Sequence, residues 1–285
     1  MQSLISIYML FGICCIFGVD ALLTTSSGEN LGSVTTLLKG NHPRKHGVCL
    51  ADTTKASVID TALKTAGLES LPILLPSQAR FAEVQTLYKS LQCDSDNVNL
   101  RDVNRATLLA GDWLTLATDL PYLSYEVPLQ KFLMLPPNLL KSDSNATPMT
   151  ATLAGILQVV GDFNKAGQND KVDYSNKILF KVTGFGSTFA SITYGNCRVS
   201  DDAERPNRLD VEFTGRCIEV IEGDATELEE LFASLGDPAA IRGFVNNNQM
   251  SLKGWSDVVY LDEEATTRVM KGNAGHFYIL TRKTK

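Results

Sequence analysis

Apolar and polar residues alternate along much of the second half of this 285-residue chain. From Thr152 onward, short runs rich in Val, Ile, Phe and Tyr are separated by Gly, Pro and Asn. This alternation is typical of strands that bury one face. It predicts strands over residues 153–163, 177–183, 187–199 and 208–221, with a turn at 201–207 between the last two. Strands at this spacing favour an antiparallel meander or barrel.

The stretch 254–283 predicts how that sheet ends. Two runs rich in β-branched and aromatic residues flank the sequence Gly272-Asn273-Ala274-Gly275. Gly and Asn tolerate the positive φ of a tight turn, so the stretch predicts a β-hairpin whose last strand spans 276–283, with one more strand before it. A strand this late in the chain has to pair with something earlier, which predicts a sheet that closes on itself.

Helical spacing of apolar residues appears in four other places. It predicts helices over residues 52–68 and 77–91, a short acidic helix over 226–234, and a helix around 129–140 that prolines bound on both sides. Residues 108–118 instead predict the first strand of the sheet, which includes the sequence Gly111-Asp112-Trp113. The pattern therefore places helices before and around a β-sheet.

Residues 1–50 have the composition of a targeting segment. The apolar run at 4–17 is shorter than the roughly 20 residues of a membrane span, and the small residues Val19 and Ala21 precede a predicted cleavage site. We therefore expect a signal peptide over 1–21, with Leu22 as the first residue after cleavage. Residues 22–50 are rich in Ser and Thr, resemble a transit peptide, and are expected to pack on nothing.

This leader predicts a protein that enters a complex plastid through the ER. The alternative is a secreted protein with a disordered pro-segment. Asn145 begins a glycosylation sequon, and Pro148 behind it disfavours its use. The sequence does not decide whether Asn145 is glycosylated.

The charge of the chain narrows the class of partner. The formal net charge is −6. An acidic body argues against nucleic acid as a partner and against electrostatic docking on anionic membranes. Any lipid partner is therefore expected to be met through apolar contact.

Two cysteines in the predicted sheet, Cys197 and Cys217, are not expected to form a disulfide with each other. If the turn at 201–207 closes a simple hairpin, Cys197 faces Asp210, and Cys217 lies about 23 Å further along the strand. A disulfide needs Cα atoms within about 7 Å of each other.

The sequence contains little that suggests catalysis. Beyond residue 50 it has one histidine, His276, which sits beside the predicted hairpin turn. It has no HExxH, P-loop or GxGxxG motif and no metal-ligand spacing of Cys residues. We therefore expect no catalytic residues, no metal and no cofactor.

Two segments resemble one known family. Residues 108–113 are similar to its Leu-Leu-x-Gly-x-Trp segment, although Ala117-Thr118 stands where a Tyr-Thr pair is usual. Near the end of the chain the similar residues are Trp255, Tyr260-Leu261-Asp262-Glu263, Arg268, Lys271-Gly272-Asn273, Gly275 and Phe277 to Leu280. Together they look like signatures of the plastid lipid-associated protein (PAP/fibrillin) family.

That resemblance implies the fold class and the function. The expected fold is mainly β, a lipocalin-like antiparallel β-barrel with N-terminal and peripheral α-helices. It would form one domain over 51–285, helical at 51–92 and a barrel at 108–285. The expected function is non-enzymatic binding or organisation of apolar lipids, quinones or carotenoids at plastoglobules or thylakoids. The alternatives are a secreted lipocalin-like carrier of a hydrophobic ligand, and a pigment- or lipid-modifying enzyme on such a barrel.

Alternate strand residues would line the barrel, and its closed end would be covered by cations. The expected lining residues are Leu114, Leu116, Ile156, Phe180, Phe189, Ile192, Val211, Phe213, Val259, Phe277 and Ile279. In lipocalin-like barrels a Trp that opens the first strand packs against an Arg near the end of the chain. The expected closure residues are Gly111, Trp113, Arg268 and Arg282.

The hairpin register decides between the two arginines. An antiparallel last strand would place Arg282 level with Trp113, whereas Arg268 would pair with Ile279, further from the barrel end. We therefore predict Arg282 as the guanidinium over the indole, with Arg268 as its rival.

Overall fold

The computed structural model describes residues 98–118, 126–141, 149–166, 171–247 and 249–283. The predicted signal peptide, the transit-like segment, the helices at 52–68 and 77–91, and Asn145 lie outside the described residues.

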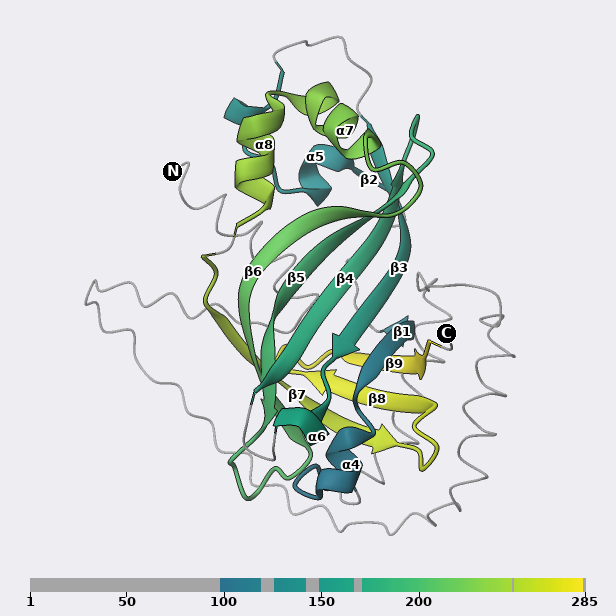
Figure 1. The fold of residues 1–285 in the computed structure, drawn as a ribbon, viewed down its shortest axis with the longest axis vertical. Coiled ribbons are helices and arrows are strands. Elements are labelled where there is room, and N and C mark those ends of the chain that lie inside the picture. The colour runs from purple at the N-terminus through teal and green to yellow at the C-terminus, as the bar shows by residue number, and fades with distance from the viewer. Residues whose placement is uncertain (1–97, 119–125, 142–148, 167–170, 248, 284–285) are drawn as a thin grey trace, which may run out of the picture.

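The described part of the chain is built around one antiparallel sheet of nine strands (Figure 1). The strands are β1 (Gly111–Thr118), β2 (Glu126–Pro128), β3 (Thr150–Val160), β4 (Val172–Val182), β5 (Thr188–Val199), β6 (Arg208–Glu222), β7 (Leu252–Leu261), β8 (Thr267–Gly272) and β9 (Phe277–Arg282). Their order in the sheet is β1-β9-β8-β7-β6-β5-β4-β3-β2, and β1 also pairs with β3. This last pairing closes the sheet into a ring, as the sequence predicted.

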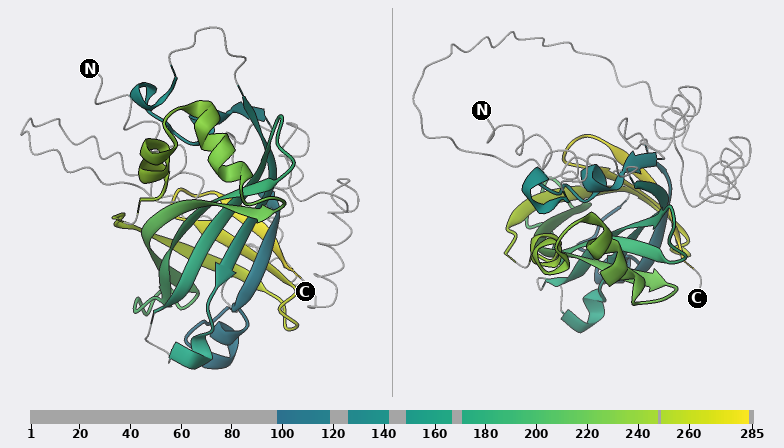
Figure 2. Two further views of the ribbon diagram at one scale, coloured as in Figure 1. Left: turned by 45° about the horizontal axis from the view of Figure 1, so that its top comes forward. Right: turned by 90° about the horizontal axis from the view of Figure 1, so that it is seen from above.

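Short helices gather at the two ends of this sheet (Figures 1 and 2). They are α4 (Val103–Thr107), α5 (Leu129–Phe132), η2 (Pro137–Leu139), α6 (Phe163–Ala166), α7 (Glu227–Leu235) and α8 (Pro238–Val245). Helices α5, α7 and α8 lie at one end, and α4 and α6 lie at the other. We call these the helical end and the Trp113 end.

Several element boundaries differ from those predicted. The predicted helix over 129–140 is divided into α5 and η2, because Pro136 and Pro137 remove the backbone donors that would join them. The first strand starts at Gly111, since Leu108 caps α4. The strand predicted over 153–163 ends at Val160, and Phe163 already begins α6.

One contact identifies the inner face of the ring. The Arg268 side chain on β8 hydrogen-bonds the Gln158 side chain on β3, although these strands are not neighbours in the sheet. The bond therefore crosses the ring. Residues paired directly across strands share a face, so the register extends the inner face from Gln158 to Trp113, Asn176 and beyond.

The inner face contains two apolar clusters. At the Trp113 end, Trp113, Tyr174, Phe213 and Leu280 belong to one cluster. At the helical end, Phe180 and Phe189 pack with residues of α5, α7 and α8. The strand residues of both clusters alternate with outward-facing ones, which is the period-2 pattern of the sequence.

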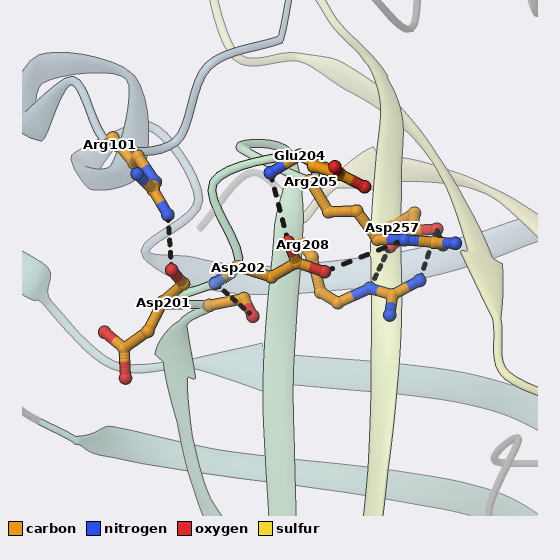
Figure 3. A network of polar contacts seen from close by, with 8 residues as sticks. Arg101, Asp201, Asp202, Glu204, Arg205, Arg208 and Asp257 are labelled. Atoms are coloured by element: carbon orange, nitrogen blue, oxygen red, sulfur yellow. Dashed lines mark hydrogen bonds and ion pairs between the residues drawn. The ribbon is translucent and has the colours of Figure 1, made fainter.

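The β5–β6 turn is held to β7 by ion pairs (Figure 3). Arg208 approaches Asp257 to 2.6 Å and donates two hydrogen bonds to its carboxylate, and Arg205 lies 3.6 Å from the same carboxylate.

The register of the β5–β6 hairpin differs by one residue from the predicted one, because Cys197 pairs with Val211 and not with Asp210. The two cysteines Cys197 and Cys217 are free, so they form no disulfide with each other, as predicted.

No helix in the described ranges is long and apolar enough to cross a membrane.

Candidate functional site

Trp113 lies inside the ring between two arginines. Its side chain is fully buried, and its indole N–H donates to the carbonyl oxygen of Leu109 at 2.8 Å. The guanidinium carbon of Arg268 lies 4.3 Å from the centre of the indole ring, and that of Arg282 lies 4.7 Å away. Both predicted arginines therefore contact the indole, and Arg268 is the nearer.

Arg282 hydrogen-bonds three separate segments of the chain at this end of the ring. It pairs with Trp113 across β1 and β9, which is the predicted register. Its Nε donates to Ala265 O at 2.7 Å, its Nη1 to Ala110 O at 2.7 Å, and its Nη2 to Leu108 O at 2.5 Å. Each of its three nitrogens thus has a backbone acceptor, so Arg282 joins α4, β1 and the β7–β8 turn.

Gly111 makes room for that arrangement. Its φ of +119° is one that other residues rarely adopt, and a Cβ there would lie 3.0 Å from Arg282 Nη1. The backbone conformation therefore favours glycine at the predicted closure residue Gly111, and a larger residue would also crowd the Arg282 guanidinium.

Arg268 lies deeper in the ring and has fewer partners. It pairs with Leu280 rather than with the predicted Ile279, because the turn closes from Gly272 N to His276 O and holds one residue more than a symmetric two-residue turn. Its Nη2 donates to Gln158 Oε1. The side chain is 0% exposed, and neither Nε nor Nη1 has a hydrogen-bond partner among the described residues.

A small polar cluster surrounds this guanidinium. Gln158 Nε2 donates to the Tyr174 hydroxyl and, at 3.2 Å, to Asn176 Oδ1. Tyr174 and Asn176 are 3% and 4% exposed. We call Arg268, Gln158, Tyr174 and Asn176 the inner polar cluster. It lies on the inner face between the two apolar clusters.

The electrostatics of the inner polar cluster leave one positive charge uncompensated. Burial raises the pKa of Tyr174 and raises the pKa of nearby Cys197 to about 12, so both stay neutral near pH 7. Burial lowers the pKa of Arg268 to about 9, which still leaves the guanidinium protonated there.

The carboxylates near the inner polar cluster lie on the opposite, outer face of the sheet. The register places Asp173, Asp210, Glu212 and Asp257 on the outer face. Several are paired there with cations, such as Glu212 with Lys171 at 2.6 Å. Among the described strand residues, none of those on the inner face of the ring is an Asp or Glu.

The structure places only some of the predicted lining residues inside. Those on the inner face are Ile156, Phe180, Phe189, Val211 and Phe213. Those on the outer face, where they do not line the interior, are Leu114, Ile192, Phe277 and Ile279. The two at strand irregularities are Leu116 and Val259. The outer-face residues belong to strands that carry apolar side chains on both faces, so alternation does not tell the two faces apart.

Sequence reasoning missed Gln158, Tyr174 and Asn176. The sequence pattern could have pointed to Tyr174 and Asn176. Tyr174 and Asn176 occupy alternate positions between Val172 and Ile178, whose side chains are buried. A polar residue in the buried register of a strand needs a hydrogen-bond partner, and this marks it for attention.

The described residues contain no group of three or more His, Cys, Asp or Glu residues that could hold a metal ion. His276 lies at the β8–β9 turn, where its backbone oxygen accepts from Gly272 N at 2.8 Å. The groups that a ligand inside the ring could contact are therefore a buried cation, polar amides and apolar side chains.

Comparisons of the chain with family models, with curated proteins and with solved structures found no match.

Proposed function

We propose that the chain is a non-enzymatic lipid-binding protein of the plastid, similar to plastid lipid-associated proteins, with a lipocalin-like barrel. It would hold an apolar lipid, quinone or carotenoid and meet the thylakoid or plastoglobule surface peripherally. The observation that carries this proposal is a closed sheet whose inner face is mostly apolar and ends at Trp113 between two arginines. Closed sheets of this size are suited to holding one small ligand.

Two further observations support the proposal. The similar residues near the end of the chain fall on β7, β8, β9 and their turns, which supply both arginines of the Trp113 end. The outer face of β5–β7 carries both acidic and basic side chains, including the Arg208–Asp257 and Lys171–Glu212 pairs. Such a face suits a water-exposed carrier better than one embedded in lipid.

Ligand capture tests the proposal directly. The purified full chain is incubated with an organic extract of thylakoid membranes and re-isolated, and its bound lipid is identified by mass spectrometry. Ile178 is 2% exposed and faces inward, so Ile178→Trp should fill the interior and reduce the bound lipid. Leu179→Trp adds the same bulk on the outer face and is the matched control.

The result would also separate the alternatives. No bound lipid in the wild-type protein, or equal amounts in both variants, would overturn the binding function. Recovery of a chemically altered lipid would favour an enzyme on the same scaffold, with the inward-facing polar side chains Arg268, Gln158 and Tyr174 as its candidate residues. A fluorescent fusion to residues 1–50 would distinguish a plastid protein from a secreted carrier.

A further inference from the structure

Arg268 is a buried cation without a counter-charge. Burying an ionised group costs several kcal/mol unless it is paired and hydrogen-bonded. Arg268 is fully buried, forms one hydrogen bond, to Gln158, and leaves its Nε and Nη1 donors without partners among the described residues. The contact of its guanidinium with the Trp113 indole at 4.3 Å offsets about 2 kcal/mol of that cost, but it supplies neither a negative charge nor acceptors for the two free donors.

The neighbouring groups cannot neutralise it. The Tyr174 hydroxyl and the Cys197 thiol remain protonated at neutral pH because both are buried. The carboxylates of β4, β6 and β7 point outward, as described above. Arg282 is the nearest other cation to the indole, and all three of its guanidinium nitrogens already donate to backbone oxygens.

We propose that Arg268 binds the carboxylate of an amphipathic ligand whose apolar tail lies along the inner face. The tail would run past Ile156 and Ile178 toward Phe180, which are buried residues of the same face. This inference rests on the proposed lipid-binding function and narrows the ligand to a long-chain monocarboxylic acid.

The chemistry of the site favours a carboxylate over other head groups. A carboxylate carries one negative charge and only accepts hydrogen bonds, so it matches one guanidinium with unused N–H donors. A neutral quinone or alcohol could accept from one donor, but it would leave the charge uncompensated. A phosphate monoester carries close to two charges at pH 7, and the inner polar cluster has one free cation to offer it.

Three probes with the same tail test the head group in the wild-type protein. Titration calorimetry of the full chain with oleate, methyl oleate and oleyl alcohol compares an anion with two neutral molecules. Hydrogen bonds to a charged group predict an affinity for oleate about ten- to a hundredfold higher than for either neutral probe. Equal affinity for all three would overturn this inference but leave the proposed function standing. Binding of none of them would count against both.

A pair of arginine variants tests the residue. Arg268→Gln should lower the affinity for oleate by about the same factor, ten- to a hundredfold, and leave that for oleyl alcohol unchanged. Arg198→Gln removes a cation from the outer face, where Arg198 is 41% exposed beside Asp201, and should change neither affinity. Equal losses for both probes in Arg268→Gln would mean that Arg268 only supports the fold. Circular dichroism would show whether that variant folds. If it does not, the inference is decided by whether the wild-type protein binds oleate more tightly than the two neutral probes.

Discussion

The inner face is buried in opposite ways at the helical end and around the inner polar cluster. At the helical end, α5, α7 and α8 cover a cluster made of apolar side chains, among them Phe180, Phe189 and Phe232. Toward the Trp113 end, the same strands enclose Arg268 and the amides of Gln158 and Asn176. Apolar packing adds stability, whereas a buried unpaired charge reduces it. We infer that the helical end stabilises the fold, whereas the region around Arg268 is shaped for a ligand.

The most damaging change is expected at the helical end. Phe180 is fully buried, stacks on Phe189 with ring centres 5.6 Å apart, and contacts Phe132 at 4.6 Å. Phe180→Ala should lower the free energy of unfolding by about 3–5 kcal/mol in urea denaturation, because it leaves a cavity among rigid neighbours. Ile221→Ala, at a residue that is 43% exposed, is the control and should change it by less than about 0.5 kcal/mol. A small loss at Phe180 would show that this end is loosely packed.

The two arginines beside Trp113 should differ in their effect on stability. Arg282→Met removes three hydrogen bonds to backbone oxygens and should cost about 2–4 kcal/mol. Arg268→Met removes one hydrogen bond but also relieves a buried charge, so it should cost less than about 1 kcal/mol. Urea denaturation measures both.

Trp fluorescence gives an independent readout of the same pair. In a Trp255→Phe background, Arg282→Met should shift the emission of Trp113 to the red, because the end of the ring opens to water. Arg268→Met should shift it less. Equal costs and equal shifts would erase the proposed distinction between a structural and a ligand-binding arginine.

A smaller, pH-dependent effect is expected where α7 meets the β4–β5 turn. Hydrogen bonds from Ser187 and Gly186 hold the pKa of Glu227 below its usual value. A lowered pKa adds stability above the unfolded pKa of about 4.3, and that stability is lost as the pH falls through the folded pKa. Glu227→Gln should therefore lower the melting temperature at pH 7, and the difference should shrink toward pH 3. The exposed Glu230 offers Glu230→Gln as a control, with no expected change.

The smallest effect concerns thiol reactivity and leaves stability unchanged. Burial raises the pKa of Cys197 inside the ring to about 12 and that of half-buried Cys217 to about 11. The lower pKa favours the reactive thiolate at Cys217, and Cys217 is also more accessible. Peptide mapping after iodoacetamide treatment should find Cys217 modified first and Cys197 modified only in urea. Similar rates would show that the Trp113 end opens often.

The sequence predicted the antiparallel sheet and its closure better than its registers. Strands β5, β6 and β9 and helix α7 lie close to their predicted ranges, because turn residues and alternation mark them clearly. Both predicted hairpin registers were off by one residue, at Cys197 and at Arg268. Turns that differ by one residue in length contain the same residue types, such as Gly and Asn. Residue types alone therefore do not fix the register of the strands on either side.

The same limit explains the errors in the candidate site. Phe277 and Ile279 on the outer face of β9 are 1% and 0% exposed, as deeply buried as Leu280 on the inner face. Where both faces of a strand are buried, alternation no longer tells inside from outside. Helix α8 was missed despite a readable signal: Asp237 caps it by accepting from Ala239 N, and Pro238 follows at its first position.

Closure of the sheet by β1 has a consequence for the order of folding. One neighbour of β1 is β9, and the bond between Arg282 and Ala110 joins residues 172 positions apart in the sequence. Contacts of such long range form slowly, because the intervening chain must first be brought into place. During synthesis, strands β3 to β6 can pair as soon as they emerge, whereas β1 waits for β9. The indole of Trp113 is therefore enclosed late, and until then the apolar wall of the future interior is open to chaperones and to aggregation.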